Sequence, residues 1–262
     1  MARKSRSTKR QQQSDDKNSV ADSAVKKGRK RGVNLTDSEV NESETKVSRQ
    51  SKPEMSRLSV DFFRNKSCTE LSKALLGQIL CRKLSPNGPL LRGRIVETEA
   101  YLGAEDKASA TYNGRRTDRL EPLYMSCGTC FVYFTYGMYY CMNLSASGDG
   151  QAVLLRAVEP LEGMDTMQTL RAKSRKAKSD KLFADKMLAN GPSKMCMAFD
   201  INKDNINKVD ITDSDLIWIE RADTVPEENI VSTGRVGIPR AQEWANKPLR
   251  FYIKNNLFIS QK

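Results

Sequence analysis

The pattern of apolar and polar residues divides the chain near residue 58. Residues 1–57 contain no aromatic side chain and few aliphatic ones, and they are rich in Ser, Lys, Arg, Gln and Asp. Such a segment cannot bury enough apolar surface to offset the entropy lost on ordering. We therefore predict a disordered basic tail over residues 1–57 and a folded domain over residues 58–262.

The folded part mixes helical and strand periodicities. Apolar residues recur at helical spacing within 62–80 and 161–170, and strand-like segments occupy 90–101, 131–145, 152–158, 216–221 and 249–253. Regular alternation of strands and helices would favour a doubly wound parallel sheet, whereas this irregular order favours an α+β fold. We expect a single compact α+β domain with a mixed, largely antiparallel sheet.

Aromatic residues are concentrated in the segment 131–140, where they fill six of ten positions. Gly137 lies within this run at a position suited to a bend, so the segment predicts a β-hairpin with its tip at 135–138. Two interpretations stay open at this point. The rings can form part of a half-buried core, or they can belong to a protruding hairpin that inserts into DNA.

A pair of glutamates lies in the strand predicted over 90–101. Because side chains alternate along a strand, Glu97, Glu99 and Tyr101 are expected to share one face. A glutamate can take a proton from water and a tyrosine ring can stack on a planar base, which together suit bond cleavage next to a nucleobase. The alternative interpretation is an exposed strand edge that carries ordinary charges.

The net charge indicates a polyanionic partner. The chain has 44 Lys and Arg against 32 Asp and Glu, a formal net charge of +12, and this surplus favours nucleic acid. Within the tail, basic residues fill five of the six positions 26–31, which is typical of a nuclear import signal or of a DNA-binding arm. We expect a nuclear location. No apolar run approaches the length of a membrane-spanning helix, so no membrane partner is expected.

The absence of histidine excludes several enzyme classes, among them the two-histidine zinc hydrolases and the histidine-based triads. The six cysteines are scattered, which favours reduced and mostly buried thiols. Cys127 and Cys130 have the spacing of a zinc-binding pair, but a structural zinc needs four ligands, and no second pair or histidine completes the set. We expect neither a metal nor a cofactor.

Several short motifs follow one another along the folded part. They are RGRIVETEAYLG at 92–103, ED at 105–106, YGMYYCMN at 136–143, VLLR at 153–156, EPLEG at 159–163, GPSK at 191–194 and PLRF at 248–251. Together they resemble the alkyladenine DNA glycosylases, also called 3-methyladenine or N-methylpurine DNA glycosylases. The resemblance covers nearly everything from about residue 58 onward and preserves order and spacing, so it is more specific than any single motif.

The resemblance implies a monofunctional base-excision repair enzyme. Such an enzyme flips alkylated or deaminated purines out of duplex DNA, hydrolyses the N-glycosidic bond, and leaves an abasic site without cutting the strand. A lesion that pairs or stacks poorly lowers the cost of extrusion, and the pocket then selects what it can hold. We expect a monomer whose partner is double-stranded DNA that contains damaged purines.

The resemblance also implies roles for the residues of the catalytic pocket. Glu99 matches a catalytic glutamate that acts as general base for a water attacking the sugar carbon, and Arg156 matches an arginine beside that water. Tyr101 and Tyr133 match residues that stack on the two sides of the flipped base. Asn143 matches an asparagine that clashes with the amino group of guanine and so spares normal bases.

Further positions are expected to contact the DNA outside this pocket. Tyr136 resembles the residue that wedges into the duplex and fills the gap left by the extruded nucleotide. Arg115 and Arg116, in the GRRT loop at 114–117, and Lys194, in the GPSK motif, are predicted to contact the DNA backbone.

One pocket position departs from the family pattern. Most members carry a histidine in the loop between the ED and GRRT motifs, where it packs on the flipped base and its sugar. This chain has Ala110 there. The change puts neutral lesions such as hypoxanthine and ethenoadenine in doubt more than charged 3-methyladenine, unless Tyr112 or a water substitutes.

Two other classes of function stay open. A catalytically weak or inactive DNA-binding protein that recognises or shields lesions is compatible with Ala110, although Glu99 and Arg156 are retained. A DNA or RNA module outside repair, with its aromatic hairpin as a stacking surface, would bind without regard to lesions through salt-sensitive phosphate contacts.

Overall fold

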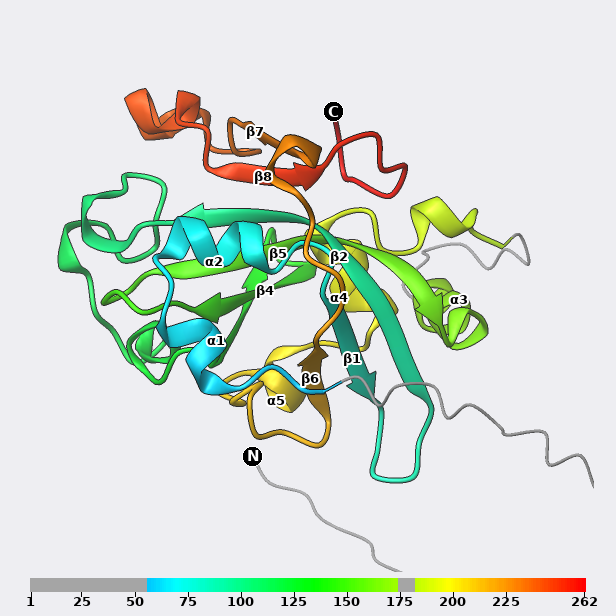
Figure 1. Ribbon diagram of the computed structural model, residues 1–262. Helices are drawn as coiled ribbons and strands as arrows, with labels where there is room; N and C mark the ends of the chain where they lie inside the picture. The colour runs from blue at the N-terminus through cyan, green and yellow to red at the C-terminus, as the bar shows by residue number, and fades with distance from the viewer. Residues whose placement is uncertain (1–55, 174–181) are drawn as a thin grey trace, which may run out of the picture. The chain divides into compact units, whose positions relative to one another are not determined.

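The computed structural model describes residues 56–173 and 182–262, which belong to one compact unit (Figure 1). This unit is an α+β domain built on a curled antiparallel sheet, so the predicted fold class is confirmed. Most of the predicted tail, residues 1–55, lies outside the described residues. At its end, the Ser56 carbonyl accepts a hydrogen bond from Arg221 N at 2.9 Å, and Arg57 forms a β-bridge with Glu220. The boundary after residue 57 therefore stays a prediction.

The sheet of the described part contains eight strands, and every pairing is antiparallel. The strands are β1 (Ile79–Lys83), β2 (Leu90–Tyr101), β3 (Cys130–Thr135), β4 (Tyr139–Ser145), β5 (Ala152–Glu162), β6 (Ile217–Glu220), β7 (Ile230–Thr233) and β8 (Arg250–Ile253). Their spatial order is β3-β4-β5-β2-β1-β6, while β8 pairs with both β2 and β7.

Strand β2 lies inside the sheet and runs past several partners (Figure 1). It pairs with β5 along one edge, and with β1 and then β8 along the other. The side chains of Glu97 and Glu99 are fully buried as a result. The interpretation of this segment as an exposed strand edge is therefore wrong, because two neighbouring strands cover both of its edges.

The pairing of β2 with β5 contains register shifts on both sides of Glu97. Glu97 lies opposite Ala157, whereas Thr98 lies opposite Leu155, so Arg156 is the extra residue of a bulge. A bulge redirects the extra side chain, and the Arg156 guanidinium reaches both Glu97 and Glu99. The irregularity of the ladder thus places one arginine between two buried carboxylates.

Five α-helices flank the sheet of the described part: α1 (Val60–Arg64), α2 (Cys68–Ala74), α3 (Met164–Lys173), α4 (Pro192–Ala198) and α5 (Lys203–Ile206). Helix α2 packs on β2 and β5, and α4 packs on β4, β5 and α3. No helix in the described part is both long enough and apolar enough to cross a membrane.

The helical segment predicted over 62–80 is two short helices and the start of a strand. Ser67 begins α2 with a capping box, in which its hydroxyl accepts from Glu70 N and the Glu70 side chain accepts from Ser67 N. Gly77 follows α2 with φ of +87°, and a Cβ there would lie 2.8 Å from the Asp223 carbonyl oxygen. The turn at Gly77 therefore sends Ile79 into β1.

The predicted aromatic hairpin is present as β3 and β4. Phe134 lies opposite Tyr140 and Thr135 opposite Tyr139, and Met138 N donates to the Thr135 carbonyl at 3.2 Å to close the turn. The interpretation as half-buried core holds for the rings at the base of the hairpin, whereas insertion of its tip into DNA stays a prediction. Phe131 is only 4% exposed, whereas Tyr136 at the tip is 82% exposed.

Strand β5 is longer than its hydrophobic pattern indicated. The strand predicted over 152–158 continues to Glu162, with Pro160 opposite Gly93. Strand β4 pairs with β5 only at Ala152, Val153 and Leu154, so Pro160 has no partner on that edge. A proline is tolerated there because no ladder hydrogen bond is lost.

Candidate active site

A cavity of about 450 Å³ opens beside the ends of β2, β4 and β5 and the aromatic hairpin. Its walls come from these strands, from the loop that holds Ala110, from the start of α4, and from residues 236–238. Six of the residues predicted for the site line it: Tyr101, Ala110, Tyr133, Tyr136, Asn143 and Arg156. The structure therefore brings together positions that are up to 55 residues apart in the chain.

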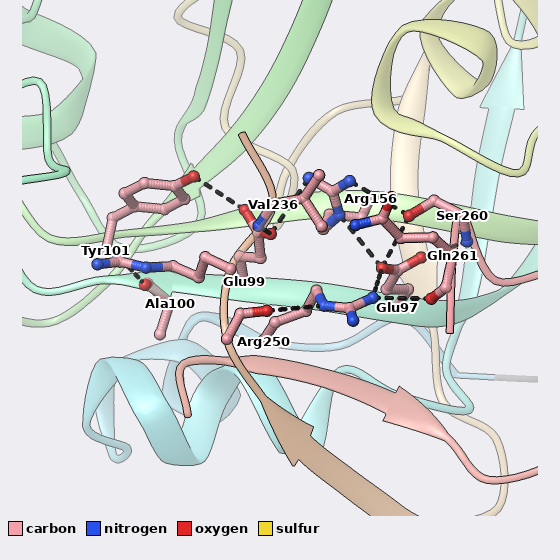
Figure 2. A network of polar contacts seen from close by, with 11 residues as sticks. Glu97, Glu99, Ala100, Tyr101, Arg156, Val236, Arg250, Ser260 and Gln261 are labelled. Atoms are coloured by element: carbon pink, nitrogen blue, oxygen red, sulfur yellow. Dashed lines mark hydrogen bonds and ion pairs between the residues drawn. The ribbon is translucent and has the colours of Figure 1, made fainter. Parts of the chain in front are cut away.

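Glu99 lies behind residues that line this cavity and is held by two hydrogen bonds and one ion pair (Figure 2). The Tyr101 hydroxyl donates to Oε2 at 2.8 Å, and Val236 N donates to Oε1 at 2.8 Å. Arg156 Nη1 lies 3.2 Å from the same Oε1. A carboxylate has about four acceptor positions, and the two hydrogen bonds occupy one on each oxygen.

The pKa of Glu99 reflects two opposing effects. Burial raises it above the ordinary value of 4.5, because the ionised form is removed from water. The positive charge of Arg156 is the largest opposing effect, followed by the hydrogen bonds from Val236 N and the Tyr101 hydroxyl. Glu99 is thus a carboxylate more basic than an exposed one, which is the property that a general base needs.

Glu97 anchors a network behind Glu99, as Figure 2 shows. Its Oε1 accepts from Arg250 Nη1 at 2.8 Å and from Arg156 Nε at 3.2 Å, and its two oxygens also accept from the hydroxyl and the backbone N of Ser260. Two arginines therefore share one fully buried carboxylate. This arrangement fixes the guanidinium plane of Arg156 and leaves Nη1 for Glu99.

Two tyrosine rings form apolar walls of the cavity. The Tyr133 ring stacks on Phe131, with centroids 5.4 Å apart and an interplanar angle of 23°. Burial is the main cause that raises the pKa of both Tyr101 and Tyr133, so both phenols keep their protons at neutral pH. Tyr101 can therefore donate to Glu99 while its ring faces the cavity.

Asn143 and Ala110 line other parts of the same cavity. Asn143 is 6% exposed and lies on β4, opposite Phe131 and Leu154. Ala110 is exposed and follows Ser109, whose hydroxyl lies 2.7 Å from that of Thr111. Thr111 in turn donates to the Gly150 carbonyl at 2.8 Å. The hydrogen bonds of Ser109 and Thr111 therefore hold the backbone on both sides of Ala110, which lines the cavity.

Tyr136 occupies the tip of the hairpin in an unusual backbone conformation. Its φ is +52°, in the left-handed region that a non-glycine residue seldom adopts. The ring is also the most exposed large apolar group in the described part, with Phe134 and Met138 exposed beside it. An exposed aromatic at a strained turn indicates a contact with a partner.

The three residues predicted to contact the DNA backbone do not line the cavity. The Arg116 guanidinium lies 4.6 Å from the centroid of the Tyr124 ring, and the Tyr124 hydroxyl donates to the Arg115 carbonyl at 2.8 Å. Lys194 Nζ donates to Asn190 Oδ1 at 2.9 Å, and burial lowers its pKa. These contacts leave their predicted role untested.

Several residues of the site had no recognisable signal in the sequence. Val236 contributes its backbone N–H, which any residue except proline provides. Arg250 and Ser260 reach Glu97 from more than 150 positions away. Arg119 lines the cavity mouth as one of many basic residues in a polar loop. Of these residues, only Arg250 lies in a motif that was singled out, PLRF, and that motif was noticed through the resemblance to the family.

The cysteine pair singled out by its spacing lies away from this cavity. Cys130 is fully buried, and burial raises its pKa, while Cys127 is half-buried. Among the described residues, no three or more His, Cys, Asp or Glu side chains lie close enough to hold a metal ion. All six cysteines are free thiols.

Comparisons with known proteins agree on one family. The family model described as methylpurine-DNA glycosylase matches residues 61–257. The human DNA-3-methyladenine glycosylase is 48% identical over 210 residues, which cover 80% of this chain and 70% of the human protein. The mouse protein of the same name is 45% identical over 206 residues, 78% of this chain and 61% of its own length.

A bacterial relative matches over almost its entire length. The putative 3-methyladenine DNA glycosylase of Clostridium botulinum (strain Alaska E43 / Type E3) is 46% identical over 202 residues, 76% of this chain and 97% of that protein. The length of this match is close to that of the segment 61–257, which the family model matches. From the family model and these identities, the chain belongs to the methylpurine-DNA glycosylase family.

Proposed function

We propose that the protein is a monofunctional DNA glycosylase of base-excision repair, which removes damaged purines from double-stranded DNA. The relatives named DNA-3-methyladenine glycosylase support the reaction class. The observation that carries the proposal is Glu99, which is buried beside a cavity and bonded to the cavity residues Tyr101 and Arg156. The attacking water is proposed to bind between this carboxylate and the cavity.

In the proposed reaction, Glu99 acts as general base. The water oxygen forms a bond to the sugar carbon C1′, and its proton passes to the Glu99 carboxylate. The bond between C1′ and the purine nitrogen breaks, and its electron pair leaves with the base. A methylated purine that carries a positive charge departs as a neutral molecule, and the sugar keeps a hydroxyl group. Glu99 then returns its proton to solvent.

Arg156 is proposed to support this step without exchanging a proton. Its guanidinium is shared between Glu97 and Glu99, and its charge lowers the pKa of Glu99 against the effect of burial. Arg156 thus favours the ionised form of Glu99, whereas burial favours the protonated form. Because the guanidinium also lines the cavity, it can hold the attacking water by a hydrogen bond.

The cavity walls are proposed to hold the flipped base. Tyr101 and Tyr133 provide rings for stacking, and their neutral phenols avoid placing a negative charge beside the leaving base. Asn143 excludes guanine through a clash with its amino group. Tyr136 enters the duplex in place of the extruded nucleotide, which its exposure at the hairpin tip supports.

Contacts with the DNA backbone are assigned to basic residues around the cavity. We propose that Arg115, Arg116 and Lys194 bind phosphates, and that Arg119 at the cavity mouth does the same. Such contacts fix the register of the enzyme on the duplex without reading the sequence. The tail over 1–57 and its basic run at 26–31 are proposed to support nuclear import, and the enzyme is proposed to act in the nucleus as a monomer.

Ala110 is proposed to set the lesion preference. A neutral base such as hypoxanthine needs a proton or a hydrogen bond in order to leave, and an alanine side chain offers neither. A charged base such as 3-methyladenine needs no such help. We therefore expect efficient release of charged lesions and slow release of neutral ones.

A second candidate function follows from the same residue. A protein that recognises lesions without cleaving them would also tolerate Ala110. It would have no need for the contacts of Arg156, Val236 and Tyr101 that change the pKa of Glu99. Release of free 3-methyladenine from methylated duplex DNA by the full chain tests the choice. Release supports the glycosylase. Tight binding of damaged over intact duplex without release supports the recognition protein, and equal binding of the two duplexes without release overturns both proposals.

A further inference from the structure

Asp106 and Arg235 form a buried ion pair beside the cavity. Arg235 Nη1 lies 2.5 Å from Asp106 Oδ2, and Nη2 lies 2.8 Å from Oδ1, so the pair is bidentate. Both side chains are 0% exposed. Neither residue lines the cavity, and neither has a part in the proposed reaction.

Arg235 makes two further contacts, and both are with the strand that holds Glu99. Its Nη1 donates to the Ala100 carbonyl at 2.9 Å, and its guanidinium lies 4.6 Å from the centroid of the Tyr101 ring. The guanidinium thus lies over the ring whose hydroxyl donates to Glu99. Arg235 therefore contacts both the backbone before Tyr101 and its ring.

The next residue in the chain bonds Glu99 directly. Val236 N donates to Glu99 Oε1 at 2.8 Å, and residues 236–238 form a wall of the cavity. Val236 directly follows Arg235, whose guanidinium contacts two carboxylate oxygens, one carbonyl and one ring. These contacts restrict the backbone position of Val236.

Asp106 bonds the backbone of a second segment that leads into the cavity wall. Its Oδ2 accepts from Leu102 N at 3.0 Å, and its Oδ1 accepts from Ala108 N at 2.9 Å. Ala108 begins the part of the loop that lines the cavity and contains Ala110. Outside the cavity, Lys107 Nζ, next to Asp106 in the chain, donates to Gln242 Oε1 at 2.6 Å.

We propose that Arg235 and Asp106 are positioning residues for the glycosylase reaction, which hold the Tyr101 ring and the Val236 N–H in the places from which they act on Glu99. This inference rests on the proposed function. The pair contacts neither the base nor the attacking water. It acts through the two hydrogen bonds that Glu99 accepts from Tyr101 and Val236.

A purely stabilising role explains this arrangement less well. A buried ion pair is weak support for stability, because an apolar replacement of similar volume is often as stable. Arg235 Nε also has no hydrogen-bond partner among the described residues, which adds a cost. The guanidinium of Arg235 thus contacts Asp106, Ala100 and Tyr101, while its Nε donor stays unpaired among the described residues.

The substitution Arg235→Lys tests the proposal. It keeps the charge, but a single ammonium cannot bond both carboxylate oxygens and the Ala100 carbonyl in the same plane. The groups that set the pKa of Glu99 are Arg156 on β5, Glu97 and Tyr101 on β2, and Val236 N. Loss of the bonds from Val236 N and Tyr101 raises this pKa, so the acid limb of the rate moves to higher pH.

The readout is single-turnover release of 3-methyladenine by the full chain, measured across pH. We expect kcat to fall about tenfold to a hundredfold, with little change in the affinity for lesion DNA and with the acid limb shifted upward. The matched control is Arg82→Lys. Arg82 is also a buried arginine, and it bonds the carbonyls of Lys83, Leu216 and Asp200, none of which lines the cavity.

Each outcome has one meaning. A shifted acid limb in Arg235→Lys, with an unshifted limb in a folded Arg82→Lys, supports the proposal. Equal loss of thermal stability in both variants, with wild-type kcat and pH profile, assigns a structural role to Arg235 and overturns it. Asp106→Asn must also lower kcat, and normal turnover in that variant overturns the role of Asp106. If the wild type releases no purine, the proposed function fails and the inference falls with it.

Discussion

The hydroxyl of Tyr101 donates a hydrogen bond to Glu99 Oε2 at 2.8 Å, from two positions further along the same strand. Alternation along β2 directs both side chains to one face. The contact gives Tyr101 two separate functions in the proposed site. Its ring forms a wall of the base pocket, and its hydroxyl stabilises the ionised form of Glu99.

Replacement of Tyr101 separates these two functions. Tyr101→Phe keeps the ring and removes the hydrogen bond that lowers the pKa of Glu99, so the acid limb of excision moves to higher pH while lesion affinity stays near wild type. Tyr101→Ala also removes the stacking surface, which is worth about 1–3 kcal/mol per base. Equilibrium binding and pH–rate profiles of the two variants check the difference. Equal affinity losses in both would contradict it.

The raised pKa of Glu99 makes stability depend on pH in a defined direction. Because the folded state holds this proton more tightly than the unfolded chain, folding stability decreases as pH rises from about 4.5 through the raised pKa. Glu99→Gln has no proton to lose at this position and lacks this decrease. Urea unfolding of the wild type and the variant at several pH values measures it. A wild type that gains stability relative to Glu99→Gln over that range would overturn the assigned direction.

Glu97 is expected to matter mainly for folding. Glu97→Gln leaves Arg156 and Arg250 without their shared buried carboxylate, and breaking a buried ion pair costs about 3–5 kcal/mol. Glu99→Gln should cost much less, because Arg156 keeps Glu97 and the burial penalty of Glu99 disappears. Denaturant midpoints compare the two directly. A Glu97→Gln protein as stable as the wild type would show that the network is dispensable.

Ala110→His should change lesion preference and leave the reaction itself intact. A histidine at this cavity position adds a ring and a hydrogen-bonding group next to the flipped base. We expect faster release of hypoxanthine, by about tenfold, which corresponds to one hydrogen bond of about 1.4 kcal/mol. Release of 3-methyladenine should stay nearly constant. Unchanged rates for both lesions in single-turnover assays would remove Ala110 as the determinant of preference.

The parts of the site that sequence predicted are those with local patterns. Alternation placed Glu99 and Tyr101 on one face of a strand, and the aromatic run with Gly137 predicted the hairpin that the structure contains. Both depend on neighbours in the chain. The cavity residues further apart, such as Tyr133 and Arg156, came from a resemblance to a family and not from spacing.

The remaining contacts depend on the folded topology. Arg250 reaches Glu97 because β8 pairs with β2 over Glu97–Glu99, a pairing that no periodicity indicates. The bulge that directs Arg156 toward both glutamates is a local irregularity of the ladder. The sequence does not distinguish Ser67 from other loop serines, but its hydroxyl caps α2. A new helix therefore begins after Ser67, and the single predicted helix is two helices in the structure.

The most direct test of the proposed mechanism is the rate of base release by Glu99→Gln. The variant keeps the size of the side chain and removes the general base, whose contribution is typically about 10²- to 10⁴-fold in rate. We predict that single-turnover release of 3-methyladenine from duplex DNA falls by that factor, while binding to the same lesion DNA is retained. Release at the wild-type rate by a folded Glu99→Gln protein would contradict the account of Glu99 as the general base.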